Sequence, residues 1–319
     1  MGGGSIDTQA IRDCYRISDV AARHTKLTRR GREHYGLCPF HQERSPSFTV
    51  IDTQGFAHCF GCGWNGDIIR FVMQADGLSF VAACEAITSG DLPLVDQQAL
   101  AKAREEDEAT KRRAIERAGE VWRASRPIAG TLGERYLLSR GITIRPERFR
   151  FAEIPSWYDD ETGECGRDRP AVVCLITDAL DRGVAIQRIF LAPDGLGKAQ
   201  DMRVAKLSFG RPAGGAIRIG PMQGDHAIVV EGPEDGATVA QMQPTQPVFV
   251  TCGTSLMPLL QFPPEIRRVT IGADNGKAGM AAAQKARAAF MDRGLEVRVT
   301  YPDPDFADWN DQLRGIKRT

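Results

Sequence analysis

The sequence predicts a multidomain protein with α+β and α/β parts: a small zinc-binding module, a helical linker, a mixed α+β segment and a parallel-sheet α/β domain. Three observations support this prediction. Two closely spaced pairs of cysteine and histidine residues lie between positions 38 and 62, a run rich in alanine and charged residues covers 96–126, and strand-like and helix-like segments alternate after Gly224. The length of 319 residues also suits two or three domains of roughly 100–200 residues each.

The composition excludes several classes of protein. Hydrophobic residues make up 42% and charged residues 26% of the chain, as in ordinary globular domains. No apolar run approaches the roughly 20 residues that a transmembrane helix needs, and the N-terminus lacks the charged and apolar regions of a secretory signal. Eight cysteines are too few for a disulfide scaffold, which leaves metal binding or buried thiols in a reducing compartment. We therefore expect a cytoplasmic protein with no membrane partner.

The charges balance overall but are segregated along the chain. The 41 basic residues equal the 41 acidic ones, and a net charge of zero by itself argues against a nucleic-acid-binding protein. Residues 20–50, however, have a net charge of +4, residues 182–218 have +5 and residues 223–319 have −2. Two cationic segments and one acidic segment are compatible with a protein that binds both phosphates and metal ions.

Local patterns predict helices around a short strand in the first 126 residues. Apolar spacing over 6–25 fits one or two short helices, and residues 48–50 are strand-like. A helix is expected to begin behind Asp67, and another covers Ser79–Ile87 with Ser79 as its N-cap. The charged run 96–126 is typical of a solvated linker helix.

The cysteine and histidine pairs have the spacing of a structural zinc site. Cys38 and His41 are separated by two residues, and after a gap of 17 residues Cys59 and Cys62 repeat that spacing. Four protein ligands complete a tetrahedral zinc site and leave no open position at which water could be activated. The sequence therefore predicts one structural Zn²⁺.

Aromatic and basic residues surround the predicted zinc site. Such a mixture is typical of proteins that bind single-stranded nucleic acid, because rings stack on bases while cations neutralise phosphates. We expect Phe48 and Phe60 to pack in the small core of the module. The residues predicted here to contact nucleic acid are Lys26, Arg29, Arg30, Arg32, Arg44 and Trp64.

The second half of the chain predicts two different sheets. Residues 133–140 resemble a short helix, and strands are expected over 171–177, 184–190 and 216–220. Beyond Gly224, continuous apolar runs predict buried parallel strands, joined by helices in βαβ units. These later strands are expected at 227–230, 248–250, 268–271 and 295–301, with helices at 237–242 and 278–290.

Acidic residues follow three of these parallel strands. Because the carboxyl ends of parallel strands meet at one edge of a sheet, we expect these acids to converge there. Converging carboxylates favour hard cations such as Mg²⁺ or Mn²⁺, although solvated loop acids and helix caps are a simpler interpretation. The acids concerned are Glu231, Asp235, Asp274, Asp303, Asp305, Asp308 and Asp311.

The N-terminal motifs resemble a known family. The stretch from Gly36 to Phe48, with its Cys-Pro-Phe-His core, and the stretch His58–Asp67, with its His-Cys-Phe-Gly-Cys-Gly core, are similar to the CHC2 zinc domain of DnaG-type bacterial and phage primases. The resemblance runs from about Ile6 to Ile87. It implies a domain that binds single-stranded template and helps to choose the initiation site.

The acidic segments resemble the Toprim fold of these primases. Glu231 matches its single glutamate, Asp235 the aspartate of Glu-Gly-x-x-Asp, and Asp274 the first of its paired aspartates. Gly276 stands where the family has the second aspartate. The last motif is either Asp303-Pro304-Asp305 or Asp308-Trp309-Asn310-Asp311, of which the latter fits the register better. The resemblance implies catalytic roles for Glu231, Asp274 and Asp308, with Mg²⁺ or Mn²⁺ bound among the seven acids.

The resemblance also implies a basic groove between the two motifs. In the family, this subdomain contacts the phosphates of template and nucleotide. Some of the basic residues in this chain would instead be exposed on hairpins without a binding role. The corresponding contacts in this chain would be Arg188, Arg203, Lys206 and Arg211. The domains implied are a zinc-binding domain at 6–93, a helical linker at 94–126, a basic subdomain at 127–222 and a Toprim subdomain at 223–319.

The function implied is that of a phage- or plasmid-type DNA primase. Such an enzyme is a nucleotidyltransferase that makes short RNA primers on single-stranded DNA from ribonucleoside triphosphates. The sequence ends at Thr319 without the C-terminal helicase-binding domain of cellular primases, which leaves open a replicative helicase on a separate chain or a shortened chain. Two alternatives remain: a DNA-binding accessory protein whose Toprim domain is weakened by Gly276, and a Toprim nuclease, against which the zinc motif argues.

Overall fold

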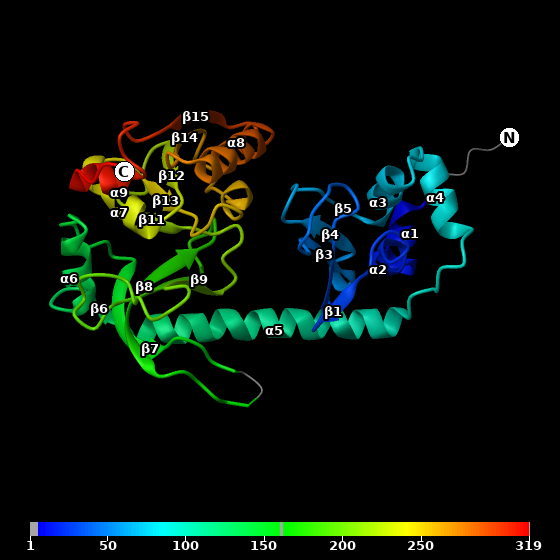
Figure 1. Ribbon diagram of the computed structural model, residues 1–319, viewed down its shortest axis with the longest axis horizontal. Coiled ribbons are helices and arrows are strands. Elements are labelled where there is room, and N and C mark those ends of the chain that lie inside the picture. The colour runs from blue at the N-terminus through cyan, green and yellow to red at the C-terminus, as the bar shows by residue number, and fades with distance from the viewer. Residues whose placement is uncertain (1–5, 160–161, 319) are drawn as a thin grey trace. The chain divides into compact units, whose positions relative to one another are not determined.

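The computed structural model of the protein describes residues 6–159 and 162–318, and it confirms the predicted fold class. The chain divides into two compact units, Met1–Thr110 and Lys111–Thr319 (Figure 1). The division falls within helix α5 (Gln97–Ala124), which occupies the segment for which a helical linker is predicted. The domain boundaries expected after residues 93, 126 and 222 stay predictions. None of the helices among the described residues is long and apolar enough to cross a membrane.

The first unit contains one antiparallel sheet with helices packed against it. Its strands pair in the order β1-β2-β3-β4-β5, so neighbours in the sequence are neighbours in the sheet. The elements are α1 (Thr8–Cys14), α2 (Ile17–Ala21), β1 (Thr28–Arg30), β2 (Glu33–Gly36), β3 (Phe48–Ile51), β4 (Phe56–Cys59), β5 (Asn65–Gly66), α3 (Ile68–Ala75) and α4 (Phe80–Thr88), with a 3-10 turn at Asp52–Gln54.

Local sequence explains where these helices begin. The carboxylate of Asp67 accepts a hydrogen bond from the backbone N–H of Arg70 at 2.9 Å, and Ser79 accepts one from Ala82 at 3.3 Å. Both side chains satisfy donors that a helix leaves unpaired at its N-terminus. Helix α3 then buries Ile68, Phe71 and their apolar neighbours in the core of the unit.

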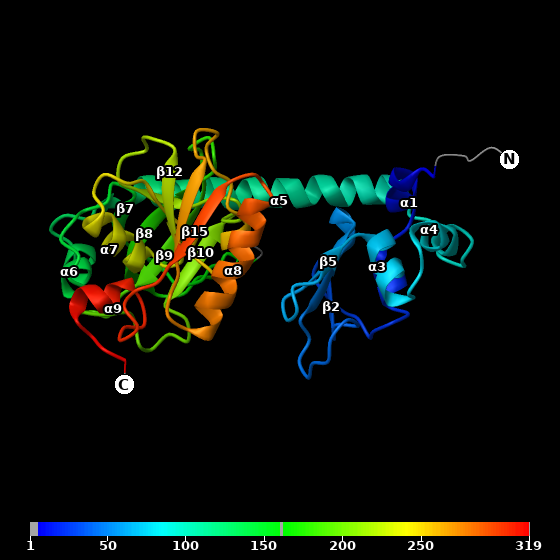
Figure 2. The ribbon, with the colours of Figure 1, turned by 90° about the horizontal axis from the view of Figure 1, so that it is seen from above.

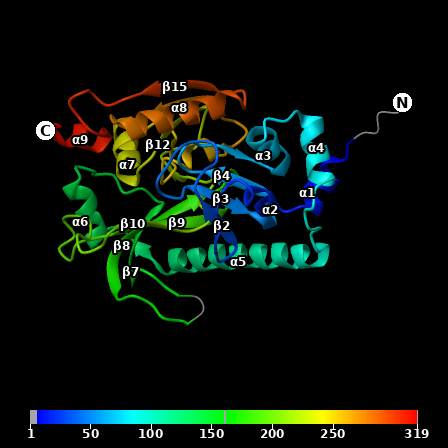
Figure 3. The ribbon, with the colours of Figure 1, turned by 45° about the vertical axis from the view of Figure 1, so that its right-hand side comes forward.

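Helix α5, drawn in Figure 3 as one continuous helix, has its start in the first unit and its end in the second. Gln97 donates a hydrogen bond to the carbonyl of Asp13 at 2.6 Å, and the Arg104 guanidinium donates one to the carbonyl of Thr53 at 2.9 Å. Residues 97 and 104 are two helical turns apart and therefore lie on one face. Near the other end, Ala118 is buried in a cluster that belongs to the second unit. One helix thus supplies packing surface to both units.

The second unit contains two five-stranded sheets. An antiparallel sheet has the order β10-β9-β8-β7-β6, and a mainly parallel sheet has the order β11-β13-β12-β14-β15. The elements are β6 (Arg126–Pro127), α6 (Leu132–Ser139), β7 (Phe149–Pro155), β8 (Asp168–Thr177), β9 (Gly183–Phe190), β10 (Lys206–Gly210), β11 (Ile217–Ile219), β12 (His226–Val230), α7 (Pro233–Met242), β13 (Val248–Val250), β14 (Arg268–Gly272), α8 (Lys277–Met291), β15 (Glu296–Thr300) and α9 (Trp309–Arg314), with a 3-10 turn at Met257–Leu259.

Strands of the parallel sheet are buried on both faces, as the continuous apolar runs predict. Ile228 and Val230 of β12 pack in the core cluster that includes helix α7, whereas Ala227 and Val229 pack in the cluster that includes helix α8. This division follows from the alternation of side chains along a strand. Figure 2 shows α8 on one side of the sheet and α7 with α9 on the other. Strand β11 is antiparallel to β13, and the other neighbours are parallel.

Candidate functional site

The four predicted zinc ligands lie together in the first unit. One ligand atom from each of Cys38, His41, Cys59 and Cys62 lies within 4.8 Å of all the others. The Sγ atoms of Cys38 and Cys62 are 3.9 Å apart, and Nδ1 of His41 is 3.8 Å from Sγ of Cys59. Three thiols and one imidazole at these separations fit a tetrahedral zinc ion. The finding supports one Zn²⁺ in the CHC2-like motif.

A carboxylate that the sequence analysis did not select supports this cluster. Glu43 accepts hydrogen bonds from the backbone N–H groups of Cys38 at 2.7 Å and Ser47 at 3.2 Å. Its other oxygen accepts one from the Ser47 hydroxyl and lies 3.3 Å from Nε2 of His41. Together these donors, Ser47 foremost, hold the pKa of Glu43 below its usual range. Carboxylates of this kind orient histidine ligands in metal sites.

Gly61 is required by the tight turn between the two cysteines. A Cβ atom at this position would lie 2.7 Å from Nε2 of His41 and 2.8 Å from the Ser47 hydroxyl. Both distances are shorter than real Cβ contacts, so any side chain here would displace His41. The glycine therefore belongs to the geometry of the site.

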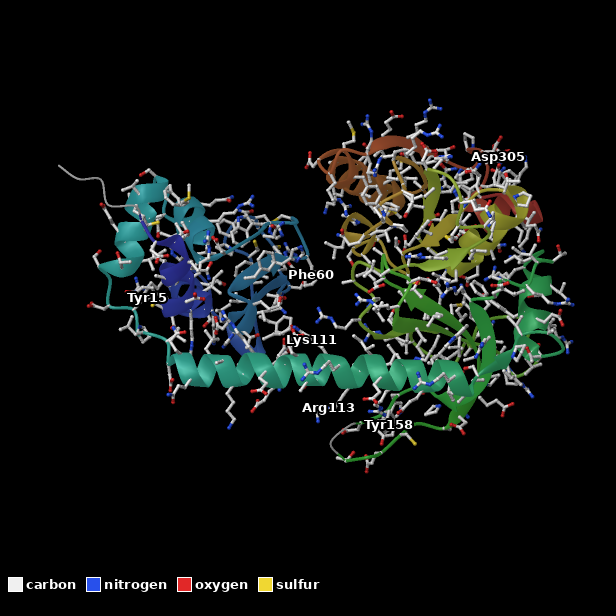
Figure 4. The ribbon with its side chains drawn as sticks, turned by 180° about the vertical axis from the view of Figure 1, so that it is seen from behind. Tyr15, Phe60, Lys111, Arg113, Tyr158 and Asp305 are labelled. Carbon is white, nitrogen blue, oxygen red and sulfur yellow. The ribbon has the colours of Figure 1, made fainter. Side chains whose placement is uncertain are left out.

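The structure corrects the sequence analysis on two aromatic residues near the cluster. Trp64 is buried, stacks on Phe40 with ring centroids 4.4 Å apart and donates a hydrogen bond to Gln74 at 2.7 Å, so it belongs to the core and is not placed to stack on a base. Phe60 was expected in the core, but 65% of its surface is exposed (Figure 4). Phe48 is fully buried, as expected.

The basic residues predicted near the zinc site lie on the surface. Arg32 is held within 3.7 Å of Glu106 and 3.5 Å of Asp107 on helix α5, so part of its charge is already neutralised. Arg29 donates a hydrogen bond to the carbonyl of Gly31 at the tip of the β1–β2 hairpin. The exposed members of the predicted set are Lys26, Arg29, Arg30, Arg32 and Arg44.

In the second unit, three predicted acids meet at the carboxyl edge of the parallel sheet. Glu231 follows β12, Asp274 lies two residues beyond β14, and Asp308 is the N-cap of α9. Burial raises the pKa of Asp274 to about 6, and the charges of Glu231 and Asp308 add to this effect. Burial also raises the pKa of Glu231, against the opposing charge of Lys206. Within the described residues, the zinc cluster is the one group of three or more such side chains whose ligand atoms all lie within 4.8 Å of one another, so the acids at this edge are farther apart.

Asp235 is buried behind this edge. It accepts a hydrogen bond from the backbone N–H of Asn310 at 3.0 Å, and Asn310 in turn donates to the Thr238 hydroxyl at 2.9 Å. Burial, together with the charges of Asp308 and Asp274, raises the pKa of Asp235 well above its usual range. In this position Asp235 ties helix α9, and therefore Asp308, to helix α7.

The remaining predicted acids have other partners. Asp305 lies at the surface (Figure 4) and forms an ion pair with Lys317 at 2.6 Å. The side chain of Asp303 accepts a hydrogen bond from the backbone N–H of Asp305 at 3.0 Å, and both acids are exposed. Asp311 donates its backbone N–H to the Asp308 carboxylate at 2.7 Å. Asp308 begins one of the two possible last motifs, and its charge raises the pKa of Asp274. This effect favours the motif that begins with Asp308.

Asn275 and Gly276 occupy the positions after Asp274. The Asn275 amide donates hydrogen bonds to the carbonyls of Pro302, Asp303 and Phe306 at 2.9–3.0 Å. Gly276 is the N-cap of α8 with an extended backbone (φ −164°), and nothing lies within 4 Å of where its Cβ would be. The glycine is therefore not required by the backbone or by packing.

The predicted basic residues of the second unit lie in three different surroundings. Arg188 lies over the rings of Phe190 and Phe209, each 5.5 Å from its guanidinium, and its burial lowers its pKa, so its role in this structure is packing. Arg203 and Arg211 are exposed. Lys206 begins β10 and lies near the acidic edge, where its charge acts on Glu231 and Asp274.

A second buried carboxylate was missed by the sequence analysis. Glu234, in the first turn of α7, accepts a hydrogen bond from the Tyr136 hydroxyl and forms an ion pair with Lys198, both at 2.8 Å. Lys206 lies 3.6 Å from its other oxygen. Burial alone would raise the pKa of Glu234, but the two lysines lower it to about 2, so the group is ionised.

Three family models match the chain and together cover most of it. A CHC2 zinc finger model matches residues 5–99, a model of a domain of unknown function (DUF7146) matches 112–219, and a Toprim model matches 226–316. The first and last of these models describe a CHC2 zinc finger and a Toprim domain, the two domains that the sequence motifs resemble. The zinc cluster lies within the first of the matched ranges and the acidic edge within the last.

Curated DNA primases are similar to this chain over part of their length. The DNA primase of Haemophilus influenzae is 33% identical over 160 residues, which are 48% of this chain and 27% of that protein. The DNA primase of Rickettsia prowazekii is 49% identical over 70 residues, 22% of this chain and 12% of that protein. The matched part of the chain thus spans about a quarter or less of the length of these relatives. A crystal structure of the Aquifex aeolicus primase, with its zinc-binding and RNA polymerase domains, is 22% identical with a TM-score of 0.46, covering 98% of this chain and 83% of that one.

Proposed function

We propose that the protein is a DNA primase that joins ribonucleotides on a single-stranded DNA template. The observation that supports this most directly is the meeting of Glu231, Asp274 and Asp308 at one sheet edge, in a chain that also has a CHC2-type zinc cluster. Its proposed substrates are ribonucleoside triphosphates and its product is a short RNA primer. A replicative helicase on a separate chain and a cytoplasmic location are part of the same proposal.

The donor set at the acidic edge fits a divalent cation. Carboxylate oxygens are the ligands that Mg²⁺ and Mn²⁺ prefer, and burial together with the charges of Glu231 and Asp308 raises the pKa of Asp274, an effect that a bound cation would oppose. Glu231, Asp274 and Asp308 would hold the ion. When bound, it would supply positive charge for the triphosphate and the attacking hydroxyl of the primer.

The protein's own residues would orient the reactants. Asp235 fixes the start of α9 through Asn310 and so keeps Asp308 in place, while Asn275 fixes the loop that leads to it. Lys206 reaches the same edge and can contact a phosphate as a point charge. A 3′-hydroxyl that attacks the α-phosphate of the next nucleotide would form one P–O bond and release pyrophosphate.

The zinc-binding unit is proposed to bind the template. Phe60 is exposed in the turn between Cys59 and Cys62, where its ring is available for stacking on a base. Exposed Lys26 and Arg44 would neutralise template phosphates. We also propose the division into a zinc-binding domain at 6–93, a linker at 94–126, a basic subdomain at 127–222 and a Toprim subdomain at 223–319.

A primer synthesis assay tests the proposal. The chain is incubated with varied single-stranded templates, ribonucleotides and Mg²⁺ or Mn²⁺, in parallel with Glu231→Gln and with Glu296→Gln, which changes an exposed glutamate on β15. We expect short RNA from the wild type and from Glu296→Gln and none from Glu231→Gln. Absence of RNA from a wild-type chain that still binds template would overturn the proposal, and cleavage of labelled DNA in the same reactions would indicate a nuclease.

Gly276 favours a second candidate, a DNA-binding accessory protein without catalysis. The position lacks the second aspartate of the Toprim motif, although the structure leaves room for one. If the wild type makes no RNA and Gly276→Asp does, the accessory role is the better description. If both make RNA, the second candidate is excluded.

A further inference from the structure

The contacts of Glu234 join the two sheets of the second unit at the acidic edge. Its Oε1 atom is 2.8 Å from both the Tyr136 hydroxyl and Nζ of Lys198. Tyr136 lies on α6 and Lys198 on the loop between β9 and β10, whereas Glu234 lies on α7 of the parallel sheet. Only 5% of the Glu234 surface is exposed. The carboxylate is thus a fixed anchor for cations that come from the other sheet.

The second oxygen of Glu234 lies near a positive charge but accepts no hydrogen bond from the described residues. Oε2 is buried and accepts no hydrogen bond within the described residues, while Nζ of Lys206 lies 3.6 Å away, beyond hydrogen-bonding distance. Lys206 is drawn toward Glu234 by charge but keeps its N–H donors free of that oxygen. The side chain of Lys206 is 39% exposed, so the residue lies at the surface of the unit and not in its core.

Gly232 shows how close Lys206 and Glu234 lie to the start of the acidic edge. A Cβ atom at position 232 would lie 2.9 Å from Oδ2 of Asp235 and 3.8 Å from both Nζ of Lys206 and Oε2 of Glu234. Gly232 directly follows Glu231, so the ammonium group of Lys206 lies close to that carboxylate in the chain. Two lysines share one carboxylate here, and the three groups together have a net charge of +1.

We propose that Glu234 is a positioning residue that fixes Lys198 and Lys206 beside Glu231, so that their ammonium groups face the triphosphate of a nucleotide bound at the acidic edge. This inference rests on the proposed function for the identity of the ligand. An unpaired lysine side chain has several rotamers, and holding it in one of them reduces the entropy that binding would otherwise cost. The anchor is a negative charge placed behind the cations, on the side away from the ligand.

The direction in which the loss of the Glu234 charge changes the affinity for an anion distinguishes a positioning role from a purely electrostatic one. Removing a negative charge near an anion site should tighten anion binding if charge alone matters. If Glu234 acts by holding the lysines, its removal should weaken binding instead. Glu234→Gln keeps the size of the side chain and the acceptor for Tyr136 while removing the charge.

The experiment measures the dissociation constant of inorganic triphosphate, and of ATP, for the full chain in Mg²⁺ buffer by calorimetry. We expect Glu234→Gln to weaken binding about five- to tenfold, and Lys206→Met about tenfold or more. Adding Glu234→Gln to a variant that carries both Lys198→Met and Lys206→Met should weaken binding no further, because Glu234 acts through the two lysines. Glu296→Gln is the matched control and should bind as the wild type does.

Unchanged or tighter binding by Glu234→Gln would overturn the proposal. Lys198→Met provides an independent test should Glu234→Gln not fold, because Lys198 is partly exposed and its replacement leaves no buried cavity. We expect it to weaken triphosphate binding several-fold, and unchanged binding would likewise overturn the proposal. Because the readout is binding, a chain that makes no RNA but shows these shifts would contradict only the proposed function.

Discussion

The carboxylate of Glu43 lies 3.3 Å from Nε2 of His41, while the other ring nitrogen of His41 lies 3.8 Å from Sγ of Cys59. With Nε2 held by Glu43, the histidine presents Nδ1 to the metal. We expect Glu43→Gln to weaken zinc affinity about 10–100-fold, because such carboxylates orient the ligand and increase its basicity. Competition with a chromophoric chelator measures this affinity. Glu85→Gln, on the exposed face of α4, should have no effect.

Cys62 and Cys165 are both exposed thiols, but only Cys62 lies in the zinc cluster. Cys62→Ser should reduce the zinc content to well below one per chain and destabilise the first unit, because a closed zinc site contributes directly to folding. Elemental analysis and thermal unfolding measure the two effects. Cys165→Ser should retain one zinc, and equal loss from both variants would contradict the assignment.

Phe60 and Phe48 provide a matched pair of aromatic substitutions. Phe60→Ala should leave stability nearly unchanged but weaken single-stranded DNA binding by about 1–3 kcal/mol, because an exposed ring can stack on a base. Phe48→Ala should cost about 3–5 kcal/mol of unfolding free energy, since that ring is fully buried. Fluorescence anisotropy and denaturant unfolding separate the two effects. If Phe60→Ala binds DNA as tightly as the wild type, the proposed stacking role is wrong.

Asp181 pairs with Arg148 through two hydrogen bonds of 2.8–2.9 Å and lies 3.6 Å from the buried Arg218. Burial would raise the pKa of Asp181, but Arg148 lowers it below the usual 3.8. A depressed pKa means that the pair stabilises the fold fully above about pH 5 and that this contribution is lost as the pH falls through the lowered value. Asp181→Asn tolerates the positive φ of 64° and removes only the charge.

The expected cost of Asp181→Asn is about 1 kcal/mol at pH 7, since half of the Asp181 side chain is exposed. The difference from the wild type should shrink below pH 4. Urea unfolding at pH 7 and at pH 3 measures both values. A difference that does not change with pH would mean that the pair does not carry the stabilisation.

Gly276→Asp tests the acidic edge by adding a carboxylate to it. The backbone is extended and the site of the new Cβ is open, so we expect no loss of stability. An aspartate at the N-cap of α8 would also be favourable for the helix. A further carboxylate beside Asp274 should tighten Mn²⁺ binding several-fold, measured by electron paramagnetic resonance. Gly294→Asp is unsuitable as a control because the φ of Gly294 is positive. Ala278→Asp, at an exposed position two residues further along α8, adds the same single negative charge and is the matched control.

Local patterns were sufficient to predict much of the architecture. The spacing of Cys38, His41, Cys59 and Cys62 predicts a cluster that the structure shows, and the apolar run at 227–230 predicts a strand buried on both faces. Strand β7 was not predicted, although Phe149 and Phe151 alternate with polar residues as a half-buried strand requires. Strand β10 was also missed because its five residues are at the sheet edge and only partly buried.

The candidate sites were less predictable where long-range contacts decide them. Glu234 is 98 residues from Tyr136 in the sequence, and nothing local indicates that they meet. The exposure of Phe60 could have been inferred, because it lies in the turn between Cys59 and Cys62, whose thiols both belong to the metal-binding cluster. The burial of Trp64 depends on Phe40 and Gln74, which no pattern links to it.

The amide of Asn275 holds three carbonyls of the segment that leads to Asp308, although Asn275 itself carries no charge and would bind no metal in the proposed site. The shape of the acidic edge therefore depends on a neutral residue. A mutation at Asn275 could leave every carboxylate in the sequence and still separate Asp308 from Asp274. Genetic screens for inactive variants should accordingly recover lesions at this position, and a survey confined to acidic residues would overlook them.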